Sequence, residues 1–123
     1  MVNSIEVKTY TITPVSKPRM TQRDKWKKRP AVMAYRAFKD ECRLHGLELA
    51  ESGNEIVFVI PMPESWSKKK RAQMSGQPHQ QRPDVDNLLK AVMDAVFDED
   101  SHLWSVKVSK VWGEVGLIIV KTP

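Results

Sequence analysis

The pattern in residues 84–97 restricts the possible folds of this chain more than any other. Apolar side chains recur there at spacings typical of one helical face, at Val85, Leu88, Leu89, Val92, Met93 and Val96. This spacing predicts an α-helix from about Asp84 to Phe97 with a continuous apolar stripe. Such a stripe has to be buried, so the helix needs a sheet or another helix to pack against.

Four other segments are predicted to be β-strands. Alternating side chains predict half-buried strands over Ile5–Thr13 and Leu103–Trp112. The apolar run Glu55–Pro61 predicts a strand buried on both faces, at the centre of a sheet. Gly113-Glu114 is typical of a tight turn, so we expect the C-terminal strand Val115–Val120 to form an antiparallel hairpin with the strand before it.

Two further segments have helical patterns. Apolar residues at three- and four-residue spacing predict a helix from Ala31 to about Leu49, with Cys42 as a small core residue. Glu64–Met74 is a candidate for a short basic helix. The resulting order β-α-β-(α)-α-β-β predicts an α/β (α+β) fold in which helices pack on a mixed β-sheet.

Length and composition limit the alternatives. A chain of 123 residues fits a single domain, 1–123, that buries roughly two thirds of its unfolded surface. The longest apolar runs are too short to span a bilayer, and the N-terminus lacks a signal-type apolar core, so we expect a cytoplasmic protein without membrane contact. Because Cys42 is the one cysteine, we expect any metal to be held mainly by oxygen atoms.

Positive charge is concentrated in two polar segments. Residues 17–30 hold seven Lys or Arg against one acid, and residues 68–82 hold five against none. The whole chain carries +5, so the remainder is net acidic. Segregated cations of this kind are typical of a polyanion-binding surface, because phosphate contacts release counterions. A merely solubilising face is the alternative.

Two acidic clusters could hold a cation. Asp84 and Asp86 stand at the start of the predicted 84–97 helix, and Asp98-Glu99-Asp100 follows its end. Taken alone, Asp84 could cap the helix and Asp86 could pair with Lys90. Clustered acids repel unless a cation neutralises them, and Mg²⁺ or Mn²⁺ prefers carboxylate, water and phosphate oxygens. Together with the basic segments, the acids favour a metal-dependent nuclease in which Lys90 stabilises the scissile phosphate.

The segment RPDVDNLLKAVMDAVFDED, with VFVIPMP before it and VKVSKVWG after it, resembles the RusA-type Holliday junction resolvases, which are often encoded by phages and prophages. The N-terminal TYTITPVSKPRMTQRDKW is similar to their opening strand and basic loop, so the resemblance covers most of the chain. It implies an α/β fold, a homodimer, dependence on Mg²⁺ or Mn²⁺, and paired cuts in four-way DNA junctions. It also implies a role in DNA recombination and repair in the cytoplasm of a bacterial or phage-infected cell.

The resemblance also assigns site residues. It places the family's essential aspartate pair on Asp84 and Asp86, its catalytic lysine on Lys90, and its third metal-binding aspartate on Asp100, ahead of Glu99 and Asp98. In some relatives a basic residue directly precedes the first aspartate, whereas Pro83 stands here and Arg82 lies one place further back. The residues that we expect to contact DNA are Lys17, Arg19, Arg23, Lys25, Lys27, Lys28, Lys68, Lys69, Lys70, Arg71 and Arg82.

The leading hypothesis is therefore a metal-dependent DNA endonuclease that resolves four-way junctions. A two-fold homodimer suits a substrate of two-fold symmetry, because each chain has one acidic motif and two strands must be cut. Two alternatives remain. One is a nuclease for other branched DNA, such as flaps or forks, and the other is a non-catalytic DNA-binding or architectural protein whose acids only cap a helix and close a turn.

Overall fold

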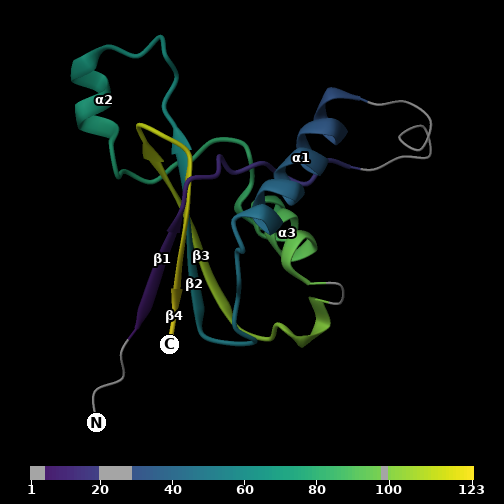
Figure 1. The fold of residues 1–123 in the computed structure, drawn as a ribbon. Coiled ribbons are helices and arrows are strands. Elements are labelled where there is room, and N and C mark those ends of the chain that lie inside the picture. The colour runs from purple at the N-terminus through teal and green to yellow at the C-terminus, as the bar shows by residue number, and fades with distance from the viewer. Residues whose placement is uncertain (1–4, 20–28, 98–99) are drawn as a thin grey trace.

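The computed structural model describes residues 5–19, 29–97 and 100–123 (Figure 1). It has a mixed four-stranded sheet with helices, which confirms the α+β fold and the expected element order. No helix in these ranges is long and apolar enough to cross a membrane. The elements, in chain order, are β1 (Glu6–Tyr10), α1 (Pro30–Leu44), β2 (Asn54–Pro61), α2 (Lys68–Met74), α3 (Val85–Val96), the 3₁₀ turn η2 (Asp100–His102), β3 (Val106–Gly113) and β4 (Leu117–Thr122).

The strands lie in the order β1-β4-β2-β3, so β2 is central, as predicted. β2 pairs with β3 in parallel and with β4 antiparallel. The expected hairpin between the last two strands is wrong, because in the described sheet β3 and β4 lie on opposite sides of β2. The physical reason is the apolar character of β2, in which Ile56 and Phe58 are fully buried. A strand buried on both faces needs a neighbour along each edge.

Helices α1 and α3 lie together on one side of the sheet (Figure 1). Their facing stripes meet in one core with the sheet, through Tyr35, Phe38 and Cys42 of α1 and Leu88, Ala91, Val92 and Ala95 of α3. The prediction of α3 from its apolar stripe is confirmed, as is the burial of Cys42, which raises the pKa of that thiol to about 12.

Helix α1 is shorter than the pattern predicted, because it ends at Leu44 rather than near Leu49. Gly46 follows with φ of +65°, in the left-handed region where side-chain-bearing residues are strained. The chain turns there, and Leu47 and Leu49 still pack on the core from the loop after the helix. Their apolar spacing continued the helical pattern, although the backbone had already left the helix.

Helix α2 stands apart from the core, and Figure 1 shows it beyond one end of the sheet. All its described residues are at least partly exposed. Contacts of Arg71 and Trp66 hold it in place. Arg71 donates to the Pro63 carbonyl at 2.9 Å and pairs with Glu114 at 3.2 Å. Just before α2, Trp66 packs on Trp112, with ring centroids 4.7 Å apart.

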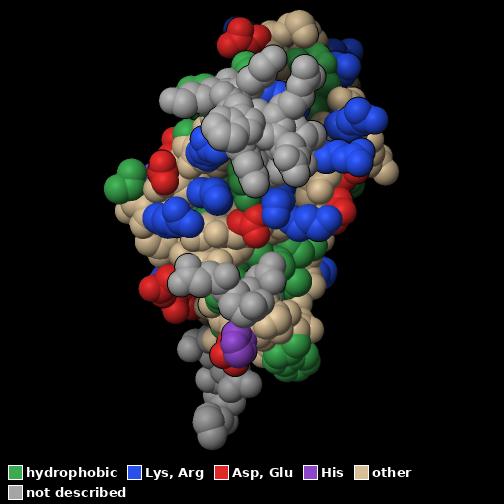
Figure 2. Space-filling model, turned by 90° about the vertical axis from the view of Figure 1, so that its right-hand side faces the viewer, with side chains coloured by type: hydrophobic (Ala, Val, Ile, Leu, Met, Phe, Trp, Pro, Cys, Tyr) green, Lys and Arg blue, Asp and Glu red, His purple; other side chains and the backbone are tan. Residues whose placement is uncertain are grey.

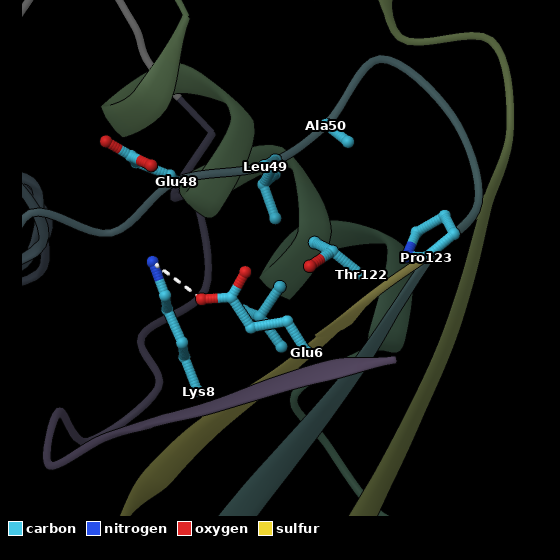
Figure 3. A pocket seen from close by; sticks show the side chains of 8 residues that line it. Glu6, Lys8, Glu48, Leu49, Ala50, Thr122 and Pro123 are labelled. Atoms are coloured by element: carbon cyan, nitrogen blue, oxygen red, sulfur yellow. Dashed lines mark ion pairs between the residues drawn. The ribbon is translucent and has the colours of Figure 1, made fainter. Parts of the chain in front are cut away.

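A hollow of about 270 Å³ lies between the neighbouring strands β1 and β4 and residues 48–50 (Figure 3). Glu6 and Lys8 both line it and pair with each other at 3.4 Å, and Glu48 lies on its rim. Because its lysine is already paired and acids outnumber it, this hollow offers nothing that would attract a phosphate. The hollows beside the start of α3 differ, because cations line them.

Candidate functional site

Asp84 occupies the N-cap position of α3, where the sequence placed the start of that helix. Its backbone is extended, with φ of −71° and ψ of 144°. Within the described helix its side chain makes no capping hydrogen bond, although an N-cap aspartate commonly does so. Asp84 is also exposed. The helix-capping alternative therefore does not explain Asp84, and its carboxylate oxygens are available to bind another group.

Asp86 lies in the first turn of α3, and its carboxylate is 3.8 Å from the ammonium of Lys90. Both side chains are more than half exposed, at 66% and 58% respectively. An exposed pair at this spacing contributes only about 0.3–0.5 kcal/mol. The contact is therefore loose, and both groups can turn to an incoming ion or phosphate at little cost.

Two adjoining hollows run beside this end of α3, and Asn87 borders both. The first, of about 430 Å³, is lined by Ser16, Arg82, Pro83, Asp84 and Asn87. The second, of about 530 Å³, is lined by Lys17, Pro18, Arg19, Asn87 and Lys90. The structure thus brings predicted acids and predicted cations to neighbouring positions. On the side of the molecule that α1 and α3 cover, Lys and Arg side chains gather around a few acids (Figure 2).

The loop after β1 is fastened along α3. The Lys17 amide donates to the Asn87 carbonyl at 3.1 Å, and its ammonium lies 2.7 Å from the Asp94 carboxylate. The Tyr35 hydroxyl of α1 donates to the same carboxylate. Burial pushes the pKa of Asp94 up, but these donors outweigh it and hold the pKa below its usual value. Burial and this hydrogen bond raise the pKa of Tyr35.

Sequence reasoning assigned no role to Asn87 or Asp94. A signal was present, because Asn87, Lys90 and Asp94 follow one another at three- and four-residue spacing on one face of α3. Asp84, at the N-cap, lines the same hollow as Asn87, so this side of α3 combines two acids, an amide and a cation. Lys17 pairs with Asp94, and its contact with DNA stays a prediction.

The basic residues on α2 fall into two groups. Lys68 and Lys69 are exposed. In contrast, Lys70 lies over the Trp66 ring, 4.3 Å from its centroid, and Arg71 is tied to Pro63 and Glu114. The first two are free to meet a phosphate, and the other two stabilise α2. Arg23, Lys25, Lys27 and Lys28, which were also expected to contact DNA, lie outside the described residues.

The acidic turn after α3 is only partly described. Asp98 and Glu99 lie outside the described residues, and for Asp100 the backbone alone is described, as the start of η2. A helix the length of α3 spans about 18 Å, and η2 follows its C-terminal end, on the way to β3 (Figure 1). Among the described side chains, no three His, Cys, Asp or Glu gather into a metal site. Asp100 as a third ligand stays a prediction.

The part of the site that the structure describes therefore consists of the exposed carboxylates of Asp84 and Asp86, the ammonium of Lys90, and the two adjoining hollows. We call these hollows the basic groove, because Lys17, Arg19, Arg82 and Lys90 line them. Comparison with known proteins adds one finding. A family model described as endodeoxyribonuclease RusA matches residues 10–122. The match covers nearly the whole 123-residue chain, including every described element except the first residues of β1. No curated protein matches the chain.

Proposed function

The chain belongs to the RusA endodeoxyribonuclease family, and we propose that it resolves four-way DNA junctions by metal-assisted hydrolysis of one phosphodiester bond at each site. Family membership makes it a DNA endonuclease of the Holliday junction resolvase type, with branched DNA as substrate. The finer statements, on the ion, the residues and the pairing of cuts, are our proposal. The observation that carries it is the pair of exposed carboxylates, Asp84 and Asp86, beside a basic groove.

The donor set suits a hard divalent cation. Asp84 makes no capping bond within α3, and Asp86 holds Lys90 only loosely, so their oxygens are available. Mg²⁺ is commonly bound by one or two carboxylates, with water and substrate phosphate filling the other positions. We assign Asp84 and Asp86 as ligands of Mg²⁺, with Mn²⁺ as substitute, and Asp100 as the proposed third. When bound, the ion lowers the pKa of an attacking water and polarises the phosphate.

The remaining groups bind and orient DNA. Lys90 lies one turn from Asp86, and its ammonium can stabilise charge that develops on the scissile phosphate. Arg19 and Arg82, both exposed, line the two hollows that meet at Asn87 and can hold neighbouring phosphates. These contacts would align the strand so that the leaving oxygen lies opposite the attacking water.

A homodimer is part of the proposal. One chain supplies one such acidic pair, while resolution of a four-way junction into duplexes requires symmetric cuts in two strands. Two copies related by a two-fold axis would match the symmetry of the substrate. Sedimentation of the purified protein, alone and with a junction, should therefore give a dimer that binds one junction.

Cleavage of a synthetic four-way junction tests the function. End-labelled strands are incubated with the protein and Mg²⁺, Mn²⁺ or EDTA, and the products are mapped. We expect symmetric cuts in two strands with either ion and none with EDTA. Asp86→Asn should bind the junction as well as the unmodified protein, since it removes a negative charge, but should not cut it. Asp40→Asn, which changes an exposed acid on α1, is the matched control and should cut normally.

Three other outcomes would change the assignment. Junction binding without cleavage under any divalent ion would favour a non-catalytic DNA-binding protein. Faster cleavage of flaps or replication forks than of four-way junctions would keep the site and change the substrate. Loss of binding in Asp86→Asn, with cleavage of the bound fraction intact, would reject Asp86 as a metal ligand.

A further inference from the structure

Lys110 reaches from the sheet to the segment that leads into α3. It lies on β3, paired in register with Phe58 of β2, and is half-buried. Its ammonium donates to two backbone carbonyls, those of Gln81 and Pro83, the second at 2.7 Å. An ammonium has three donors, so it can satisfy both carbonyls at once. Such charge-assisted bonds are roughly twice as strong as neutral ones.

Several contacts hold residues 76–83, which lead into α3, against β3, and the Lys110 ammonium makes the last of these along the chain. Residues 76–79 run beside β3, where Gly76 and Gln77 bond to Trp112 and the His79 amide donates to the Lys110 carbonyl at 3.0 Å. The His79 ring packs on Trp112, with centroids 4.2 Å apart. Lys110 therefore holds the chain both at His79, through its backbone, and at 81–83, through its side chain.

These contacts matter because they lie directly before Asp84. The Pro83 carbonyl belongs to the peptide group that joins Pro83 to Asp84. Pro83 has no N–H of its own, so its carbonyl is the polar backbone group by which this residue can be fixed. The Asp84 side chain makes no capping bond to the described helix. The Asp84 backbone is thus held on its helix side by the Leu88 amide, which donates to the Asp84 carbonyl at 3.2 Å, and on its loop side by the Lys110 ammonium at the Pro83 carbonyl.

We propose that Lys110 is a positioning residue, which holds the Gln81 and Pro83 carbonyls so that the Asp84 carboxylate is preset to bind a divalent cation. The inference rests on the proposed function and adds to it a residue that touches neither ion nor DNA. Groups that hydrogen-bond a ligating side chain commonly contribute roughly 10- to 100-fold to metal affinity. Lys110 acts through the backbone instead, so we expect an effect at the lower end of that range. A preset ligand binds more tightly because less freedom is lost on binding.

Lys110→Met tests the inference, since it keeps the length of the side chain and removes its donors. Lys107→Met is the matched control, because it removes the same charge from an exposed position on the same strand and the opposite face of the sheet. Mn²⁺ binding is measured without DNA, from the electron paramagnetic resonance signal of free Mn²⁺. Circular dichroism melting shows whether each variant is folded at the measuring temperature.

For Lys110→Met we expect Mn²⁺ affinity to fall about tenfold. The Mn²⁺ concentration for half-maximal cleavage should rise by a similar factor, while junction affinity in the absence of metal stays unchanged. Lys107→Met should keep the Mn²⁺ affinity of the unmodified protein. A purely structural role for Lys110 would lower the melting temperature without changing Mn²⁺ affinity in the folded protein.

The two hypotheses fail in different ways. If the unmodified protein binds Mn²⁺ and cuts junctions, and folded Lys110→Met does both at the same Mn²⁺ concentrations, the positioning role is overturned and the proposed function stands. If the unmodified protein neither binds Mn²⁺ nor cuts DNA, both are overturned. If Lys110→Met does not fold, Lys110→Gln replaces it. Its shorter amide reaches at most one carbonyl, so we again expect weaker Mn²⁺ binding, and unchanged binding would overturn the inference.

Discussion

The ammonium of Lys17 lies 2.7 Å from the carboxylate of Asp94, and the Tyr35 hydroxyl donates to the same carboxylate. Three elements therefore meet at Asp94: the loop after β1, helix α1 and helix α3. The contact fixes the loop that lines the basic groove, where Arg19 lies near Asn87 and Lys90. We therefore expect the Lys17–Asp94 ion pair to contribute more to the free energy of unfolding than an isolated surface pair does.

We expect Asp94→Ala to lower the free energy of unfolding by about 1–2 kcal/mol, because it leaves Tyr35 and Lys17 without their acceptor. The range is discounted for the partial exposure of the pair. Urea unfolding measures it. Glu6→Ala, which removes the exposed Lys8–Glu6 pair, is the control and should cost less than about 0.5 kcal/mol. Equal effects of the two substitutions would contradict the anchoring role of Asp94.

The same contact should make stability depend on pH in the acid range. The pKa of Asp94 is lowered in the folded chain. Its contribution is therefore complete above the usual carboxyl pKa near 4 and is lost as the pH falls through the lower folded value. Asp94→Asn should flatten the fall of the melting temperature below about pH 4 relative to the unmodified protein. If the melting temperature of Asp94→Asn falls with pH as steeply as that of the unmodified protein, the Asp94 contacts are not stabilising.

Lys68 and Lys69 should contribute to DNA binding through charge alone. Both are exposed, so replacing both with Ala should weaken junction binding and reduce the slope of log K against log salt concentration by about 1.8, at about 0.9 per phosphate contact. Stability should stay within about 0.5 kcal/mol. Titrations at several salt concentrations measure the slope, and an unchanged slope would exclude α2 from the interface.

Arg71→Ala is the companion to that experiment. Arg71 is committed to the Pro63 carbonyl and Glu114. We therefore expect its loss to loosen α2, seen as faster proteolysis within residues 62–75, with a smaller change in salt slope than the double lysine variant. A slope change as large as that of the lysines would show that Arg71 leaves Glu114 to bind DNA.

Lys90→Met should separate chemistry from folding. Its pair with Asp86 is exposed and 3.8 Å long, so the loss should change stability by less than about 0.5 kcal/mol. If Lys90 stabilises charge on the phosphate, single-turnover cleavage should fall about 100-fold or more while junction binding weakens only modestly. A variant that cuts at the normal rate would remove Lys90 from the mechanism.

His79 should make the protein less stable at mildly acidic pH. It is buried against Trp112, and burial, with the nearby Lys110 charge, lowers its pKa. The unfolded chain therefore takes up a proton more readily than the folded one, and stability is lost as the pH falls below about 6.5. One such group can contribute a slope of at most about 1.4 kcal/mol per pH unit. In His79→Phe the melting temperature should therefore change less between about pH 8 and 5 than in the unmodified protein.

Asp100→Asn addresses the third ligand. We expect it to bind junctions and lose cleavage, as Asp86→Asn does, and we expect Glu99→Gln to cut normally. A reversed result would assign the role to Glu99. Full cleavage by both variants would leave Asp84 and Asp86 as the metal ligands, with water and phosphate completing the coordination.

The sequence predicted those parts of the fold that depend on local periodicity. The stripe from Val85 to Val96 and the apolar run in β2 identified a helix and a central strand, because burial of one helical face or of both strand faces leaves a direct pattern. The end of α1 was missed because Leu47 and Leu49 continued the spacing, while the turn depended on the single backbone conformation of Gly46.

The other missed features depend on contacts between distant segments. β4 pairs with β2 instead of β3 because β2, which is buried on both faces, needs a neighbour along each edge. The turn pattern at Gly113 is local and carries no information on this choice of partner. The alternation of Trp104, Val106 and Val108 with Ser105, Lys107 and Ser109 identified a strand. The contact of Lys110 with the Pro83 carbonyl arises only when β3 lies beside the loop, so this pattern could not predict it. Asp84 and Asp86 could be predicted as a pair because they are neighbours in sequence, and their role as ligands stays a prediction.

The placement of β2 next to β3 has a consequence for how such a protein can change. The chain leaves one of these strands and returns on the other, and between the two it forms α2, Asp84, Asp86, Lys90 and Asp100. All proposed ligands, and one of the two basic segments, thus belong to the single connection between β2 and β3, two strands that lie side by side. Lengthening, shortening or replacing this connection would alter which DNA is cut, while the paired strands remain intact. Residues 62–105 are therefore a natural unit for grafting onto a related scaffold.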